Sequence, residues 1–220
     1  MTYEAVVFDL DGTLLDTLAD LADSLNQVLR EKGHPTHPTE AFCHFVGNGA
    51  AKLVSRALPA EKRNDTMAAD CLEAFRQVYS QHWNKKTQPY DGVPKLLDAL
   101  TTNGMAMAVF TNKPQHFAEL CVKEFLSRWE FAAIRGQQEG FPLKPDPAGA
   151  REIARSLGIS TEVCLYLGDS DVDMQTAVNA RMHPVGAKWG FRSEEELRMH
   201  GAIDVIDHPT DLLQILDLFY

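Results

Sequence analysis

Acidic residues directly follow the first apolar run of the chain. In VVFDLDGT, Asp9 and Asp11 come after residues 6–8. A spacing of two places both carboxylates on the same side of an extended chain, and two like charges that close need a cation beside them. Mg²⁺ prefers carboxylate, carbonyl and water oxygens. The stretch therefore predicts a magnesium site, and the alternative is a strand-end turn whose carboxylates cap backbone amides.

A second acidic group follows another apolar run, residues 163–167. In GDSDVD, Asp169, Asp171 and Asp173 stand within five positions of each other. Capping of a helix N-terminus accounts for one such residue, not for three. A cluster that faces a metal ion is the better interpretation.

Two further segments add a hydroxyl and a cation. Thr111 begins TNKP, where a hydroxyl and the backbone N–H groups of a loop entering a helix can hold a phosphate. Thr and Asn are also ordinary turn and cap residues. Lys144 stands between prolines in PLKPDP, and it is either a fixed positive charge for an anion or an exposed loop lysine. Phosphoryl transfer needs a nucleophile, a divalent ion and fixed positive charge, so the set predicts that chemistry.

These residues follow short, uniformly apolar runs, which are typical of strands covered on both faces of a parallel sheet. Strands alternating with helices predict an α/β fold with a doubly wound, Rossmann-like parallel sheet, and ligands bind beyond the carboxyl ends of such strands. The expected strands are residues 5–8, 105–110, 131–134, 163–167, 182–187 and 202–206. The expected helices between them are residues 93–102, 115–129, 147–157 and 172–180.

A long helical stretch separates the first expected strand from the second. Thr17 and Asp20 predict a capping-box-like helix start, and Gly33 predicts the helix end. Further helical patterns cover residues 39–45, 50–58 and 64–83. We therefore expect an all-helical domain of residues 17–87 inserted in an α/β core domain of residues 1–16 and 88–220.

Charge and composition exclude several classes of function. The 220 residues carry a formal net charge of −10 with no stripe of Lys and Arg, so nucleic-acid or anionic-membrane binding is not expected. An anionic substrate would need local cations to overcome this charge. No apolar run is long enough to span a membrane, and the first residues do not resemble a signal peptide. The cysteines lack metal-ligand spacing, which favours reduced thiols in a cytoplasmic protein; a monomer and a homodimer both remain open.

The ordered set DLDGT, FTN, LKPDP and GDSDVD resembles the haloacid dehalogenase-like hydrolase superfamily over essentially the whole chain. The resemblance implies that Asp9 attacks phosphorus to form an aspartyl-phosphate and that Asp11 serves as acid and base. A carboxylate at position 11 favours phosphomonoester hydrolysis or phosphomutase chemistry over dehalogenation. Thr111 and Lys144 would contact phosphate oxygens. Mg²⁺ would be held by Asp9, the backbone carbonyl of Asp11, and Asp169, with Ser170 and Asp173 behind these ligands.

Within the superfamily, the chain is most similar to phosphoglycolate phosphatases, and the helical insert resembles the small cap of that group. The similarity rests on VGNGA, Leu53 and residues 56–58 in the insert, and on TNKP and WGF elsewhere. It implies a small phosphorylated metabolite as the partner molecule, with 2-phosphoglycolate first. A glycine pair can open backbone N–H groups toward an anion, and a plain turn is the alternative. The implied substrate-binding residues are Gly47, Asn48, Gly49, Arg56 and Asn112.

Other functions stay open beside the phosphatase. A sugar-phosphate mutase would use the same residues, and so would a phosphatase for another small phosphate or pyrophosphate. A non-enzymatic phosphoacceptor module would also phosphorylate a strand-end aspartate, but such receiver domains are shorter and lack a cap.

Overall fold

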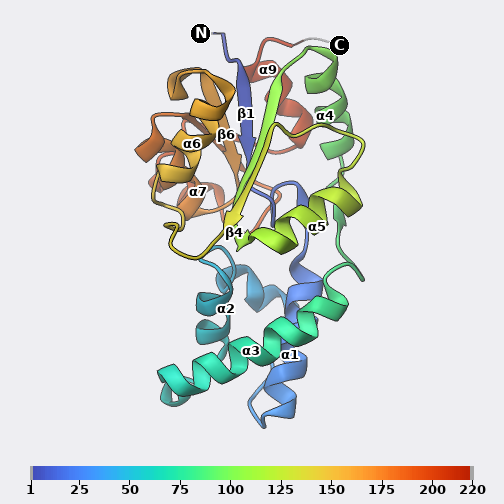
Figure 1. Cartoon of the computed structure of the whole chain (residues 1–220), viewed down its shortest axis with the longest axis vertical. Coiled ribbons are helices and arrows are strands. Elements are labelled where there is room, and N and C mark those ends of the chain that lie inside the picture. Colours follow the sequence, from blue (N-terminus) through green and yellow to red (C-terminus); the bar gives the residue numbers. More distant parts are fainter. Residues whose placement is uncertain (1, 219–220) are drawn as a thin grey trace.

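The computed structural model describes residues 2–218, in which a parallel sheet is flanked by helices and a separate helical group lies at one end (Figure 1). Among these residues the sheet has six strands in the order β5-β4-β1-β6-β7-β8, and all neighbours are parallel. The strands are β1 (Ala5–Phe8), β4 (Ala106–Pro114), β5 (Ala133–Gln137), β6 (Cys164–Gly168), β7 (His183–Ala187) and β8 (Asp204–Ile206). The predicted α/β class with a parallel sheet is confirmed.

The central strand shows why the sheet needs cover on both faces. All four residues of β1 are fully buried, and successive side chains of a strand point to opposite faces. Val6 and Phe8 join one apolar cluster, whereas Ala5 and Val7 join another. Helices of the first cluster are α4 (Val93–Thr102), α5 (Gln115–Phe125) and α9 (Leu212–Ile215). Helices of the second are α6 (Ala148–Leu157) and α7 (Asp171–Ala180), and α8 (Glu194–Met199) packs against β7 and β8.

Residues 17–87, which we call the helical segment, have an apolar core of their own. In Figure 1 this segment lies below the sheet. Its helices are α1 (Leu18–Glu31), α2 (Ala50–Ala57) and α3 (Asp65–His82), with 3₁₀ turns at Thr39–His44 and Ala60–Lys62. Leu25, Phe42 and Phe75 belong to a cluster distinct from the two that cover the sheet. That separate core supports the domain boundaries at residues 16/17 and 87/88, which stay a prediction. We call the rest of the chain the α/β part.

The chain crosses between these two parts through a short two-stranded ribbon. Strand β2 (Leu15–Asp16) pairs antiparallel with β3 (Gln88–Pro89), so the outgoing and returning segments lie side by side. The sequence gives little sign of strands this short. The ribbon places the helical segment over the carboxyl end of β1.

The first helix begins after Thr17 as predicted, but the predicted capping hydrogen bonds are not formed. The Thr17 side chain makes no cap hydrogen bond, and the Asp16 carboxylate accepts from the Leu18 N–H at 3.3 Å instead. Asp20 is buried against the returning chain, where its carboxylate accepts from the N–H groups of Lys86 and Thr87. Its side chain is therefore used across the crossing rather than at the helix end. Gly33, in the left-handed region just past α1, ends the helix as predicted.

Within residues 2–218, the structure contains no helix with the length and apolar character needed to cross a membrane. The four cysteines are free thiols. Burial raises the pKa of both Cys121 and Cys164 to about 11, which leaves them unreactive near neutral pH.

Candidate active site

The chemistry-bearing residues meet at the carboxyl ends of three neighbouring strands. Asp9 directly follows β1, Asp169 directly follows β6, and Thr111 lies near the end of β4. Because β1 pairs with β4 on one side and β6 on the other, these ends share one edge of the sheet. Residues 111–114 are not the predicted loop: they continue β4, although its register with β5 is interrupted there.

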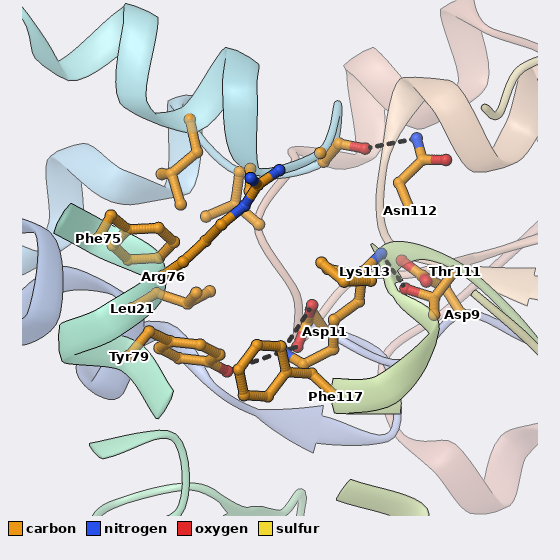
Figure 2. Close-up of a pocket in the computed structure, with 16 residues that line it drawn as sticks. Asp9, Asp11, Leu21, Phe75, Arg76, Tyr79, Thr111, Asn112, Lys113 and Phe117 are labelled. Carbon is orange, nitrogen blue, oxygen red and sulfur yellow. Dashed lines mark hydrogen bonds and ion pairs between the residues drawn. The ribbon is translucent and has the colours of Figure 1, made fainter. Parts of the chain in front are cut away.

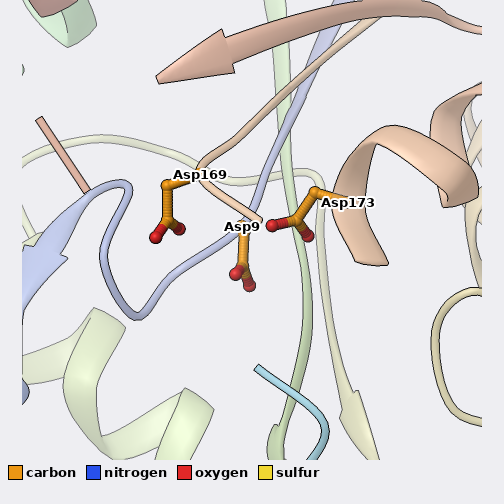
Figure 3. Close-up of side chains that lie close together, drawn as sticks. All are labelled: Asp9, Asp169 and Asp173. Atoms are coloured by element: carbon orange, nitrogen blue, oxygen red, sulfur yellow. The ribbon is translucent and has the colours of Figure 1, made fainter. Parts of the chain in front are cut away.

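Three carboxylates converge at this edge. Asp9, Asp169 and Asp173 each offer an oxygen within 4.8 Å of the other two, and all three residues are buried (Figure 3). Burial raises the pKa of Asp9 to about 7, and the charge of Asp173 adds to that rise. Burial also raises the pKa of Asp169, with Asp173 and Asp9 contributing. Such a cluster is a place for a cation, because its ionised form is otherwise strongly disfavoured.

Asp169 is held by contacts from two distant parts of the chain. The Thr13 hydroxyl donates to one carboxylate oxygen and the Phe191 N–H to the other, each at 2.8 Å. A Cβ at Gly12 would lie 2.4 Å from an Asp169 oxygen, and one at Gly190 would lie 2.2 Å from the Asp169 Cβ. The glycines of DLDGT and WGF therefore leave the room that this carboxylate occupies.

Lys144 is a buried part of the site and not an exposed loop lysine. Its side chain is 2% exposed, and Nζ lies 2.6 Å from Asp173 and 2.9 Å from Asp9. Nζ also donates to the Phe110 carbonyl at 3.1 Å. Burial would lower the pKa of Lys144, but the neighbouring Asp173 and Asp9 outweigh it and raise that pKa well above its ordinary value. Lys144 is therefore a fixed positive charge beside Asp9.

A divalent cation fits this donor set. Lys144 pairs with Asp9 and Asp173, so one lysine stands against three buried carboxylates and the cluster keeps an excess of negative charge. Clustered carboxylate oxygens suit Mg²⁺, Mn²⁺ or Ca²⁺. Of the predicted ligands, Asp9 and Asp169 belong to the cluster, and Asp173 is its third member. The Ser170 hydroxyl donates a hydrogen bond to the Asp173 carboxylate at 2.5 Å. The Asp11 carboxylate lies apart from it.

The Asp11 carboxylate is paired with a lysine that the sequence analysis missed. Lys113 Nζ lies 2.8 and 3.2 Å from the two Asp11 oxygens and donates to the Tyr79 hydroxyl of α3 at 2.8 Å. The Lys113 side chain is 3% exposed. The period of two along β4 could have revealed it, because Thr111 and Lys113 fall on the same side of an extended strand. This contact joins the α/β part to the helical segment.

A pocket lies between the acidic edge and the helical segment (Figure 2). Its wall in the α/β part carries the polar groups, and its wall in the helical segment is mainly apolar. The lining residues are Asp9, Asp11, Leu21, Val46, Gly47, Gly49, Ala50, Leu53, Phe75, Arg76, Tyr79, Thr111, Asn112, Lys113, Pro114 and Phe117. The site is thus a strand-end cluster closed over by helices.

The predicted substrate-binding residues are only partly brought together. Gly47 and Gly49 line the pocket, but Asn48 and Arg56 do not. The Arg56 guanidinium donates to the carbonyls of Phe45 at 3.1 Å and His44 at 3.4 Å, so its charge is used within the helical segment. Asn112 lines the pocket, but its side-chain amide already forms hydrogen bonds within the protein.

Two side chains of the α/β part tie down the loop that carries Gly47. The Asn112 amide donates to the Gly47 carbonyl at 3.0 Å and accepts from the Lys144 N–H at 2.9 Å. Arg192, also absent from the predicted set, donates to the carbonyls of Cys43 and Val46. These bonds hold the loop against the edge of the sheet that carries the acidic cluster.

Comparisons with known proteins agree with this arrangement. The family model described as haloacid dehalogenase-like hydrolase matches residues 6–187. A phosphoglycolate phosphatase of Pseudomonas putida is 34% identical over 94% of this chain and 78% of its own length, and one of Psychrobacter arcticus is 30% identical over 98% and 96%. A crystal structure from Lactobacillus delbrueckii subsp. bulgaricus has 33% identity and a TM-score of 0.93, covering 98% of this chain and 99% of that one. The predicted family resemblance is confirmed.

Proposed function

Because the chain belongs to the haloacid dehalogenase-like hydrolase family, we propose that it is a Mg²⁺-dependent phosphatase that hydrolyses 2-phosphoglycolate through an aspartyl-phosphate on Asp9. One observation carries the proposal. The buried carboxylate of Asp9 meets the buried Lys144 and the acidic cluster at one edge of the sheet, and Asp9 also lines the pocket below the helical segment. These are the parts that phosphoryl transfer requires.

In the first half of the reaction, an Asp9 oxygen bonds to phosphorus as the ester P–O bond breaks. Asp11, which lines the same pocket, donates a proton to the departing alkoxide. Lys144 and the Thr111 hydroxyl contact the equatorial oxygens, with Lys144 already fixed by Asp173. A bound divalent ion would supply charge neutralisation between the carboxylates and the phosphoryl group.

In the second half, water attacks the phosphorus of the aspartyl-phosphate and gives a proton to Asp11. The Asp9 carboxylate and inorganic phosphate are released, so Asp11 returns to the protonated form that starts the next cycle. Lys113, which holds the Asp11 carboxylate at 2.8 Å, keeps that group aimed into the pocket. The helical segment limits the entry of other water during these steps.

The choice of 2-phosphoglycolate rests on the relatives and on the pocket. Both bacterial relatives named above are phosphoglycolate phosphatases. The wall formed by the helical segment includes Leu21, Leu53 and Phe75, which offer no hydrogen bonds to the hydroxyl groups of a sugar. A small substrate with few hydroxyls suits such a wall.

The direct test is phosphate release from a panel of monoesters with and without Mg²⁺. We expect 2-phosphoglycolate to rank first by kcat/KM. Both metal removal and Asp9→Asn should lower its turnover by more than about 10³-fold, because removal of a catalytic nucleophile has effects of this order. Asp91→Asn, a change of an exposed acid outside the pocket, is the matched control. Equal rates for wild type and Asp9→Asn would refute the mechanism, and sugar-phosphate isomerisation without net phosphate release would favour a mutase.

A further inference from the structure

The charges of the α/β wall are already balanced within the site. Lys144 is paired with Asp9 and Asp173, and Lys113 is paired with Asp11. The four carboxylates, including Asp169, are matched by these two lysines and one divalent ion. An ester that bears a carboxylate beside its phosphate would bring a further negative charge that none of these cations is free to balance.

Arg76 is the remaining cation among the described residues that line the pocket. It stands on α3 between Phe75 and Tyr79, both of which face the same pocket. Figure 2 shows its side chain extending from the helix into the space that the other labelled residues surround. The side chain is 57% exposed, and its one ion pair is a 3.9 Å contact with Glu73. Exposed pairs of this kind hold a side chain weakly.

We propose that the Arg76 guanidinium binds the carboxylate of the substrate and so determines the preference of the pocket for phosphate monoesters that carry a second anionic group. This inference rests on the phosphatase function proposed above. The guanidinium is always charged, and its planar fork of N–H donors matches a carboxylate in a bidentate pair.

The surroundings of Arg76 strengthen such a pair. Leu21, Leu53 and Phe75 line the same pocket, so a bound ester would displace part of the water around the exposed guanidinium, and charge pairs strengthen when water is displaced. The chain as a whole is strongly acidic, which disfavours anions at long range. A cation at the pocket wall offsets that repulsion where the substrate enters.

Arg56, the arginine implied by the sequence, cannot fill this role in the observed arrangement. Its guanidinium donates to the carbonyls of His44 and Phe45, and it does not line the pocket. Lys52 is also outside the lining and is exposed. The helical segment therefore offers a matched control: Lys52→Gln removes the same charge as Arg76→Gln without changing the pocket.

The test compares two pairs of esters that differ in the carboxylate: 2-phosphoglycolate with ethyl phosphate, and 3-phosphoglycerate with glycerol 3-phosphate. For Arg76→Gln with Mg²⁺, we expect kcat/KM to fall about 10- to 100-fold for the carboxylate-bearing member of the pair that the enzyme accepts, mainly through KM, because hydrogen bonds to charged groups are of that strength. The partner ester without a carboxylate should change less than about threefold. Arg76→Lys should restore part of the loss, and Lys52→Gln should match wild type.

Equal losses for both members of a pair, or no loss at all, would overturn the role of Arg76. Failure of the phosphatase proposal has a different signature, namely no phosphate release from any ester by the wild type. In that case a binding measurement still tests the role of Arg76. Calorimetry of 2-phosphoglycolate and ethyl phosphate with Mg²⁺-loaded Asp9→Asn, with and without Arg76→Gln, should show weaker binding of the carboxylate ester alone; an equal Kd for the two proteins would refute it.

Discussion

The two walls of the pocket are built in opposite ways. On the side of the α/β part, Asp9 and Asp169 follow strand ends, Lys144 lies beside them, and all three are buried and fixed by ion pairs or hydrogen bonds. On the wall of the helical segment, apolar side chains surround Arg76, which has one weak ion pair. Loss of Lys144 would leave the buried carboxylates of Asp9 and Asp173 without their cation, whereas loss of Arg76 would remove only a weak, exposed ion pair. Under the proposed function, the α/β part would therefore determine the reaction and the helical segment the choice of substrate.

Removal of Lys144 should have the largest effect, on both phosphate release and the free energy of unfolding. Lys144→Met leaves Asp9 and Asp173 buried without their cation, so we expect phosphate release to fall by about 10³-fold or more. The free energy of unfolding of the metal-free protein should fall by about 3–5 kcal/mol. Denaturant unfolding and steady-state assays measure these losses. Lys123→Met on the exposed side of α5 should change neither quantity, and a stable, active Lys144→Met protein would refute the description of the α/β wall.

Metal removal should make the free energy of unfolding depend on pH. Burial raises the pKa of Asp9 to about 7, whereas the same carboxyl in an unfolded chain titrates near 4. Between these values the folded, metal-free protein keeps a proton that the unfolded chain has lost, so its unfolding free energy falls as pH rises from about 4 to about 7. Mg²⁺ favours the ionised cluster and offsets this fall.

Thermal unfolding from pH 5 to pH 8 measures this effect with EDTA and with Mg²⁺. The increase in Tm that Mg²⁺ produces should grow with pH and should be smaller in Asp9→Asn, which lacks the titrating carboxyl. An increase that is the same at every pH would show that the cluster does not titrate as described.

The smallest expected effect concerns the hydrogen bond between Lys113 of the α/β part and Tyr79 of the helical segment. Tyr79→Phe removes the hydroxyl that accepts from Lys113 but leaves the ion pair of Lys113 with Asp11, so the loss should be about 1.5 kcal/mol, the lower end for a hydrogen bond to a charged group. We expect a loss of up to about tenfold in kcat/KM, since Lys113 would hold Asp11 less firmly. In a Lys113→Met background the same change should have almost no effect. Additive losses in the double variant would mean that Tyr79 acts without Lys113.

The sequence predicts the α/β wall well because its information is local. Asp9 and Asp169 directly follow buried strands, and parallel strands bring their carboxyl ends together by geometry alone. Lys144 lies in a segment without regular structure, where its prolines left a fixed charge and an exposed loop lysine both open, and only the family resemblance favoured the fixed charge. None of these inferences requires knowledge of which helix face meets which neighbour.

The other wall depends on tertiary contacts that the sequence does not specify. The helical period of α3 groups Phe75 and Tyr79 but does not say that Arg76 faces the pocket or that Tyr79 meets Lys113 of β4. Arg56 has the right charge and lies in a motif that resembles the family, yet nearby carbonyls engage its guanidinium. Asp20 was misassigned for the same reason, because the returning chain at Lys86 and Thr87 takes its carboxylate.

The β2 and β3 ribbon has a consequence for how such enzymes diversify. Leu15 pairs with Pro89 and Asp16 with Gln88, so the points where the chain leaves and re-enters the α/β part are separated by the spacing of paired strands, about 4.5–5.5 Å between Cα atoms. One contiguous stretch of the gene encodes everything between them. Recombination can therefore exchange that stretch for another with adjoining ends while the sheet and its strand-end aspartates keep their positions, so new specificity can be acquired without rebuilding the catalyst.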